Sequence, residues 1–89
     1  MYAAVMHLVF DATFAAEAAT AFTNELLPKV TAAEGFRGGY WLDPENGQGL
    51  AFMLFDDRSQ AAHASAAEHW QAPGVVIERV DIRRVAATA

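Results

Sequence analysis

Residues 33–60 read AEGFRGGYWLDPENGQGLAFMLFDDRSQ, and this stretch decides the fold. It joins the end of a helix, an aromatic-rich strand, a tight turn, an apolar strand and the start of a second helix. Gly35 suits the left-handed conformation that ends a helix, because glycine has no Cβ to clash there. In the turn, Pro44 fixes φ, and the pair Asn46 and Gly47 accepts positive φ. The stretch therefore predicts a β-hairpin between two helices.

The segments on either side complete a βαββαβ order. We expect strands over residues 2–11 and 75–85, a first helix from residue 14 to a last turn that ends at Gly35, and a second helix over residues 58–70. Pro28 lies inside the first helical pattern and predicts a kink over residues 24–28. Right-handed crossovers turn this order into a ferredoxin-like antiparallel sheet with both helices on one face. The sequence therefore predicts a single α+β domain over residues 1–89, with the second face of the sheet left bare.

The composition indicates that this bare face is covered by another subunit. Apolar residues make up 54% of the 89-residue chain. A chain of this size buries only about 60 to 65% of its unfolded surface on its own. The apolar excess fits a monomer that reserves one face for a partner, and two sheets packed face to face would bury it. We therefore expect a homodimer.

Residues 35–64, GFRGGYWLDPENGQGLAFMLFDDRSQAAHA, resemble the central hairpin and second helix of the dimeric α+β barrel superfamily, in particular its antibiotic-biosynthesis-monooxygenase-like branch. Members commonly show a helix ending in Gly-Phe, a glycine-containing second strand and a short turn. An apolar third strand ending in an aromatic residue and an acid follows, and a helix starts at once. In element order the resemblance covers almost the whole chain, and it implies a dimeric α+β barrel.

The charge and the missing cysteine exclude several classes of function. A net charge of −5 and a pI near 4.9 argue against nucleic acid or an anionic membrane surface as a partner. The absence of cysteine excludes disulfides, thiolate nucleophiles and Cys-type metal sites. No apolar run approaches the roughly 20 residues of a membrane span, so the expected location is the cytoplasm.

Aromatic residues predict a pocket between the helices and the sheet. Flat aromatic walls with a few placed donors suit a planar apolar ligand, such as a polyketide-like phenol or quinol. The alternative is that the same rings simply form the core. The predicted lining is Phe22, Tyr40, Trp41, Phe52, Phe55 and Trp70, with His7 as its polar element.

The resemblance also implies a mechanism. The monooxygenases of this superfamily use no metal or flavin: the substrate is deprotonated, and its electron-rich anion reacts with dioxygen. Such a reaction needs a base, a donor to the developing oxyanion and a dry pocket. On this basis His7 is the expected base, and Tyr40 or Trp41 the donor. The competing interpretation is a buried His7 that is satisfied by a backbone carbonyl.

We expect no cofactor and no metal. Haem-degrading members of the superfamily use an asparagine on the first strand and a tryptophan in the second helix. This chain has His7 and Ala64 at the matching positions, which argues against haem. His63 and His69 are six residues apart, about 600° around a helix, so we expect them on different faces rather than on one metal ion.

The leading prediction is therefore a cofactor-independent monooxygenase that acts on a small aromatic compound. A second prediction, from a different class, is a non-catalytic barrel that binds a hydrophobic metabolite or serves as a stress-associated assembly module. An isomerase or lactone-handling enzyme of the same fold is a third. The sequence does not decide among these three, because the fold pattern is shared by all of them.

Overall fold

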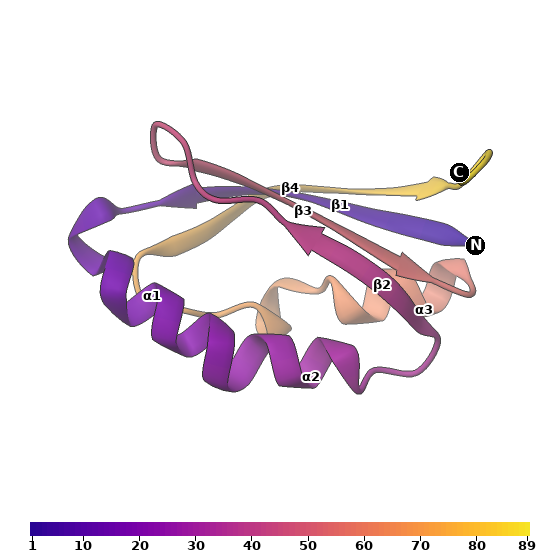
Figure 1. Ribbon diagram of the computed structural model, residues 1–89, viewed down its shortest axis with the longest axis horizontal. Coiled ribbons are helices and arrows are strands. Elements are labelled where there is room, and N and C mark those ends of the chain that lie inside the picture. Colours follow the sequence, from indigo (N-terminus) through magenta and orange to yellow (C-terminus); the bar gives the residue numbers. More distant parts are fainter.

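The computed structural model describes residues 1–89 as a sheet covered on one face by helices (Figure 1). The strands are β1 (Tyr2–Phe10), β2 (Phe36–Trp41), β3 (Gln48–Phe55) and β4 (Val75–Arg84). The helical segments are the 3-10 turn η1 (Ala12–Phe14), α1 (Ala15–Ala21), the π-helical turn η2 (Phe22–Leu26), α2 (Leu27–Thr31), α3 (Arg58–Ala64) and the 3-10 turn η3 (Ala67–His69). None of the helices is long and apolar enough to span a membrane.

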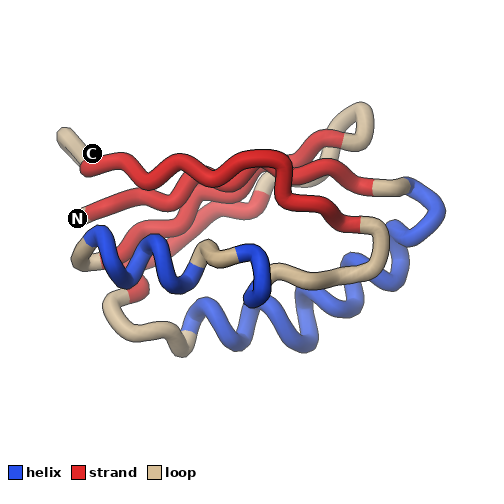
Figure 2. Tube along the Cα trace, turned by 180° about the vertical axis from the view of Figure 1, so that it is seen from behind, coloured by secondary structure: helices blue, strands red, loops and turns tan.

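The four strands form one antiparallel sheet in the order β2-β3-β1-β4. Both helical crossovers lie on the same face of this sheet (Figure 2). The two chain ends lie together, where the Val85 N–H donates a 3.0 Å hydrogen bond to the Met1 carbonyl. This α+β arrangement is compatible with the expected ferredoxin-like fold. The element order departs from a plain βαββαβ because each crossover is broken into several helical segments.

The hydrophobic core lies between the helices and the two central strands. Met6, Met53 and Phe55 are fully buried and come from the neighbouring strands β1 and β3. Leu26 and Val30 close the core from the side of the first crossover. Burying a side chain of this size stabilises a fold by about 1.5–3 kcal/mol. The helix-covered face of the sheet is therefore the face that holds the monomer together.

The hairpin and its flanking caps are confirmed. Gly35 and Gly47 have φ of 78° and 76°, and Asn46 has φ of 54°. The Gln60 N–H donates to Asp57 Oδ1 over 2.8 Å at the start of α3, and the Asp57 N–H donates back to Gln60 Oε1 over 3.2 Å. The Gln60 N–H, followed by the Ser59 hydroxyl, lowers the pKa of the Asp57 carboxyl. These features follow from the chemistry of single residues and their nearest neighbours.

The first crossover contains a π-helical turn in the region where we expected a kink. Over Phe22–Leu26 the backbone widens, and the Leu27 N–H donates to the Phe22 carbonyl, five residues back. Pro28 follows at once and has no N–H to give to the preceding turn. The effect of Pro28 is therefore a local change of helical register rather than a break.

The predicted second helix over residues 58–70 is too long. α3 ends at Ala64, and only a 3-10 turn follows. The Ser65 hydroxyl donates to the Ala61 carbonyl over 2.8 Å, which competes with the continuing helical ladder. Trp70 is buried, and its Nε1 donates to the Ala64 carbonyl over 2.6 Å. Tertiary packing of the indole thus ends a helix that local propensity would have extended.

Candidate functional site

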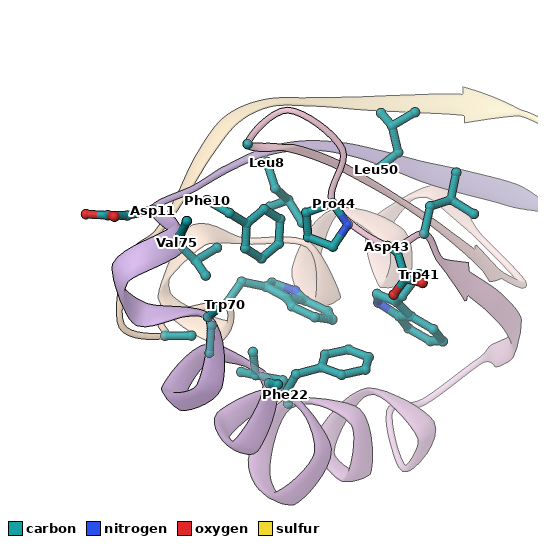
Figure 3. A pocket seen from close by; sticks show the side chains of 18 residues that line it. Leu8, Phe10, Asp11, Phe22, Trp41, Asp43, Pro44, Leu50, Trp70 and Val75 are labelled. Atoms are coloured by element: carbon teal, nitrogen blue, oxygen red, sulfur yellow. The ribbon is translucent and has the colours of Figure 1, made fainter.

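A cavity of about 470 Å³ lies between the first helical crossover and one end of the sheet (Figure 3). Fourteen of its eighteen lining residues are hydrophobic. Its aromatic walls come from β1, the π-helical turn, β2 and the segment after α3. They are Phe10, Phe22, Trp41 and Trp70. Its volume falls within the range of about 300–1,000 Å³ that small-molecule pockets occupy.

The cavity exists because the helices leave this end of the sheet lightly covered. α1 turns only small residues toward it, namely Ala15, Ala18 and Ala19. α3 stops after seven residues, and the chain then continues as a short turn and a loop. Bulk is supplied by the π-helical turn, from which Phe22 reaches into the cavity wall (Figure 3).

The indole of Trp41 is held in place by its neighbours. Its ring centroid lies 5.7 Å from that of Phe22 and 6.5 Å from that of Phe36. A Cβ added at Gly39 would stand only 2.9 Å from the Trp41 ring, so the glycine leaves room for the indole to lie along β2. Such aromatic pairs prefer tilted or offset arrangements, as here. The Trp41 ring is therefore a fixed wall rather than a mobile side chain.

The two indole N–H groups of the cavity differ in their hydrogen bonding. Trp70 Nε1 is bonded to the Ala64 carbonyl. Trp41 Nε1 is buried and has no hydrogen-bond partner. A buried donor without a partner costs about 1–3 kcal/mol, so such groups are rare unless something else binds them. Trp41 Nε1 is thus the unused polar group of an otherwise apolar wall.

Two carboxylates line the cavity, and no basic side chain does. Asp11 accepts a 2.9 Å hydrogen bond from the Thr13 N–H and points away from the cavity in Figure 3. Asp43 is exposed, and its side chain makes no hydrogen bond or ion pair within the protein. Asp43 follows β2 directly, two residues after Trp41. One end of the cavity therefore offers an unused donor and an unused acceptor.

The sequence-predicted site residues are divided between two faces of the sheet. Phe22, Trp41 and Trp70 line the cavity. His7, Tyr40 and Phe52 lie on the helix-free face, and Phe55 is fully buried in the core. The prediction that all seven residues line one pocket is therefore wrong, because successive strand residues point to opposite faces of the sheet. Their catalytic and binding roles stay predictions.

His7 takes part in a small polar cluster on the helix-free face. Arg79 Nη2 donates to His7 Nε2 over 3.0 Å, and Arg79 Nε donates to Asp81 Oδ2 over 2.9 Å. A guanidinium can only donate, so His7 Nε2 is the acceptor in this contact, and the same nitrogen lies 3.7 Å from Asp81 Oδ2. His7 is half-exposed and is held by Arg79, not by the backbone carbonyl that the sequence suggested. It cannot reach a ligand in the helix-side cavity.

A second hollow, of about 490 Å³, lies on the helix-free face beside His7. The loop between β2 and β3 rises on this side of the sheet and forms one wall (Figure 1). Only three of its ten lining residues are hydrophobic, and Asp43, Glu45 and Glu78 give it an acidic lining. It is wide and polar, which suits water better than a flat apolar ligand.

His63 and His69 lie closer together than the helical spacing predicted. Their ring centroids are 5.0 Å apart, because α3 ends at Ala64 and the following turn brings His69 back. No three histidine, aspartate or glutamate side chains are grouped as ligands for a metal ion. The prediction that the two rings lie on different faces is therefore wrong, because it assumed one unbroken helix over residues 58–70.

The sequence missed Phe10 and Asp43 as lining residues. Phe10 ends β1 on the same face as Met6, so strand parity was the signal that could have found it. Asp43 was interpreted only as a turn residue. Asp43 lies two residues after Trp41, and this spacing was the signal that both side chains lie on the same face of the sheet.

No model of a known protein family matches this chain, and no curated protein is significantly similar to it. The resemblance of residues 35–64 to the dimeric α+β barrel superfamily therefore stays a prediction. What the protein does has to follow from the cavity and from the two faces of the sheet.

Proposed function

We propose that this protein binds a small, flat, mainly apolar molecule in the helix-side cavity. The observation that carries the proposal is an aromatic-walled cavity of about 470 Å³ that contains a buried, unpartnered indole N–H. A ligand ring between Phe22, Trp41 and Trp70 would replace water by aromatic contact. A ligand acceptor at Trp41 Nε1 would supply the hydrogen bond that the free protein lacks.

The second candidate is oxygenation of such a ligand without a cofactor, as in the monooxygenases that the sequence resembles. It is favoured by Asp43, a carboxylate without a partner, in the same cavity as the Trp41 N–H. Asp43 would accept a proton from the substrate, and Trp41 would donate to the oxyanion. Reaction of a methylene carbon with dioxygen then gives a carbonyl and water. In this candidate mechanism Asp43 is the general base, the role that the sequence assigned to His7.

Oxygen uptake tests the catalytic candidate. Purified protein is mixed with anthrones, naphthols and hydroquinones, without metal, flavin or haem, and dioxygen consumption is followed with an electrode. We expect Asp43→Asn to lower the rate by about 10²-fold or more, the usual contribution of a general base. His7→Leu should leave the rate within about twofold, because His7 faces the other side of the sheet.

The outcomes separate the candidates. Asp43 borders both hollows, so uptake that depends on both Asp43 and Trp41, but not on His7, supports catalysis in the helix-side cavity. Uptake that depends on His7 and not on Asp43 would move the reaction to the other face. Binding without uptake leaves the non-catalytic candidate, a barrel that carries a hydrophobic metabolite. If no compound binds, the proposal fails for both candidates.

We propose further that the helix-free face pairs with its copy in a homodimer, as the dimeric α+β barrels do. Two large side chains there are exposed: 71% of Tyr40 and 36% of Phe52. Phe52 pairs with Val5 on one side and with Tyr40 on the other, so the apolar row is continuous. Arg79 and Asp81 add one charge of each sign, which a two-fold axis could pair.

Sedimentation equilibrium tests the dimer. We expect the wild-type protein at twice the chain mass of 9.6 kDa, and Phe52→Glu at the mass of one chain. Phe52 is already exposed in the monomer, so the charge should not disturb the core. Ala62→Glu adds the same charge to the exposed side of α3 and should stay dimeric. A monomeric wild-type protein, or a dimeric Phe52→Glu, would count against this interface.

A further inference from the structure

We infer that Trp41 and Asp43 together form a hydroxyl-binding corner of the cavity, which orients the ligand and selects it by its hydrogen-bonding group. The inference rests on the proposed function, because it needs a ligand in the helix-side cavity. It adds the feature that the ligand must carry, which is one group that both accepts and donates a hydrogen bond.

The donor of the corner is Trp41 Nε1. This nitrogen is closed to solvent and has no partner within the protein. The ring cannot turn to find one, because Phe22 and Phe36 pack on it and Gly39 lies beneath it. Trp70, the other indole of the wall, is already bonded to the Ala64 carbonyl. A ligand atom that accepts from the wall therefore accepts from Trp41.

The acceptor of the corner is the Asp43 carboxylate. Trp41 is the last residue of β2, and Asp43 lies two residues after it. Both residues line the cavity. Figure 3 shows them on the same side of the cavity, opposite Asp11. Asp11 is already occupied as the cap of η1. Asp43 is therefore the carboxylate that is free to accept from a ligand.

A neutral hydroxyl matches this pair better than other common groups. Its oxygen accepts from the Trp41 N–H, and its proton goes to the Asp43 carboxylate. An ether oxygen satisfies only Trp41, and an ammonium group satisfies only Asp43. A ligand carboxylate would meet the like charge of Asp43, with no basic side chain in the lining to offset it. The corner therefore selects an aromatic hydroxyl compound over its ether and over its acid.

Four probes that share one ring system test this selection. They are 2-naphthol, 2-methoxynaphthalene, naphthalene and 2-naphthoate, and their affinities are measured by equilibrium dialysis. For the wild-type protein we expect 2-naphthol to bind about tenfold more tightly than naphthalene, which is the usual gain from a hydrogen bond or two. The ether should fall between them, and 2-naphthoate should bind most weakly.

Three variants assign the effect. Trp41→Phe keeps an aromatic ring and should remove the advantage of both 2-naphthol and the ether over naphthalene. Asp43→Ala should lower the advantage of 2-naphthol to that of the ether, and should raise the affinity for 2-naphthoate. Glu45→Ala removes a charge from the same loop but not from the helix-side cavity, and should change none of these ratios.

A second readout needs no variant of the corner. In the ¹⁵N-labelled wild-type protein, the indole N–H resonance of Trp41 should move with 2-naphthol and the ether but not with naphthalene. The chain has two tryptophans, and Trp70→Phe assigns their two indole signals. The indole signal of the wild-type protein therefore tests the inference even if the Trp41→Phe variant fails to fold.

The outcomes are distinct. If the probes bind with equal affinity, or if the Trp41 indole signal stays in place with 2-naphthol, the corner is overturned and the proposed ligand cavity stands. If none of the probes binds, both the corner and the ligand cavity are overturned. Selection of 2-naphthol that survives in both Trp41→Phe and Asp43→Ala would place the hydroxyl elsewhere in the cavity, and would also overturn the corner.

Discussion

Trp70 ends α3 from a distance of six residues: its Nε1 donates a hydrogen bond to the carbonyl oxygen of Ala64, the last residue of that helix, over 2.6 Å. The bond is buried, so its loss leaves a carbonyl without a partner. We predict that Trp70→Phe lowers the free energy of unfolding by about 1–3 kcal/mol. Urea denaturation followed by circular dichroism measures the change.

Trp41→Phe is the matched control for that prediction. It removes the same atoms from the same cavity wall, but the indole N–H that it removes has no partner. Its loss of stability should therefore be clearly smaller than that of Trp70→Phe. Equal losses in the two variants would mean that ring size, and not the bond to Ala64, sets the stability.

Gly35 and Gln60 are predicted to be energetically coupled. A Cβ at Gly35 would lie 1.8 Å from Gln60 Oε1, and the residue has φ of 78°. Gly35→Ala should therefore cost more than the roughly 1 kcal/mol expected for the backbone alone, because Gln60 must leave the cap of α3. In a Gln60→Ala background the same substitution should cost less. Additive effects in this double-mutant cycle would contradict the coupling.

Asp57 should give the protein a pH-dependent stability at low pH. Its pKa is lowered in the folded protein, first by the Gln60 N–H and then by the Ser59 hydroxyl. A lowered pKa means that its stabilising effect is present above the unfolded pKa, near pH 4, and is lost as the pH falls through the folded pKa. Asp57→Asn keeps a side-chain cap without the charge. Its melting temperature should be below that of the wild type at pH 7, and the difference should narrow as the pH falls below 4.

Gly49 should control the size of the cavity through Phe10. A Cβ at Gly49 would stand 2.5 Å from Phe10 Cε2, so the ring must move, and Phe10 is part of the cavity wall. We predict that Gly49→Ala weakens the binding of 2-naphthol by about tenfold, equal to about 1.4 kcal/mol of overpacking. Phe10→Leu in the same chain should restore most of the affinity. If Gly49→Ala binds as well as the wild type, Phe10 does not border the ligand.

Local chemistry explains which parts of the fold could be predicted. Gly35, Asn46 and Asp57 were predicted correctly because each conformation depends on the residue itself and on one or two neighbours. The end of α3 could not be predicted in this way. It depends on the hydrogen bond of the Ser65 hydroxyl to Ala61 and on the packing of Trp70 against the last residue of the helix, and neither follows from the helix propensity of an alanine-rich segment.

The site was predicted in part for a similar reason. Trp41 and Trp70 were found because large aromatic residues dominate small cavities. Tyr40 and Trp41 could not both line one pocket, since adjacent residues of a strand face opposite sides, and this was already readable in the sequence. The place of His7 was harder to predict. Strand parity groups it with Val5 and Val9, but only the packing of the helices shows which group is covered.

The π-helical turn at Phe22–Leu26 has a consequence for how this protein could change. It fits one residue more than an α-helical turn would use. The wide turn takes up this extra residue locally, so α1 and α2 keep their faces toward the sheet on both sides of it. Deleting an exposed residue such as Thr23 would return the turn to the α register and move Phe22, which the turn carries into the cavity wall. Every strand pair of the sheet would stay as it is. In this chain the shape of the binding space therefore depends on a residue count in one helical turn, and a single deletion there changes the cavity on an unchanged scaffold.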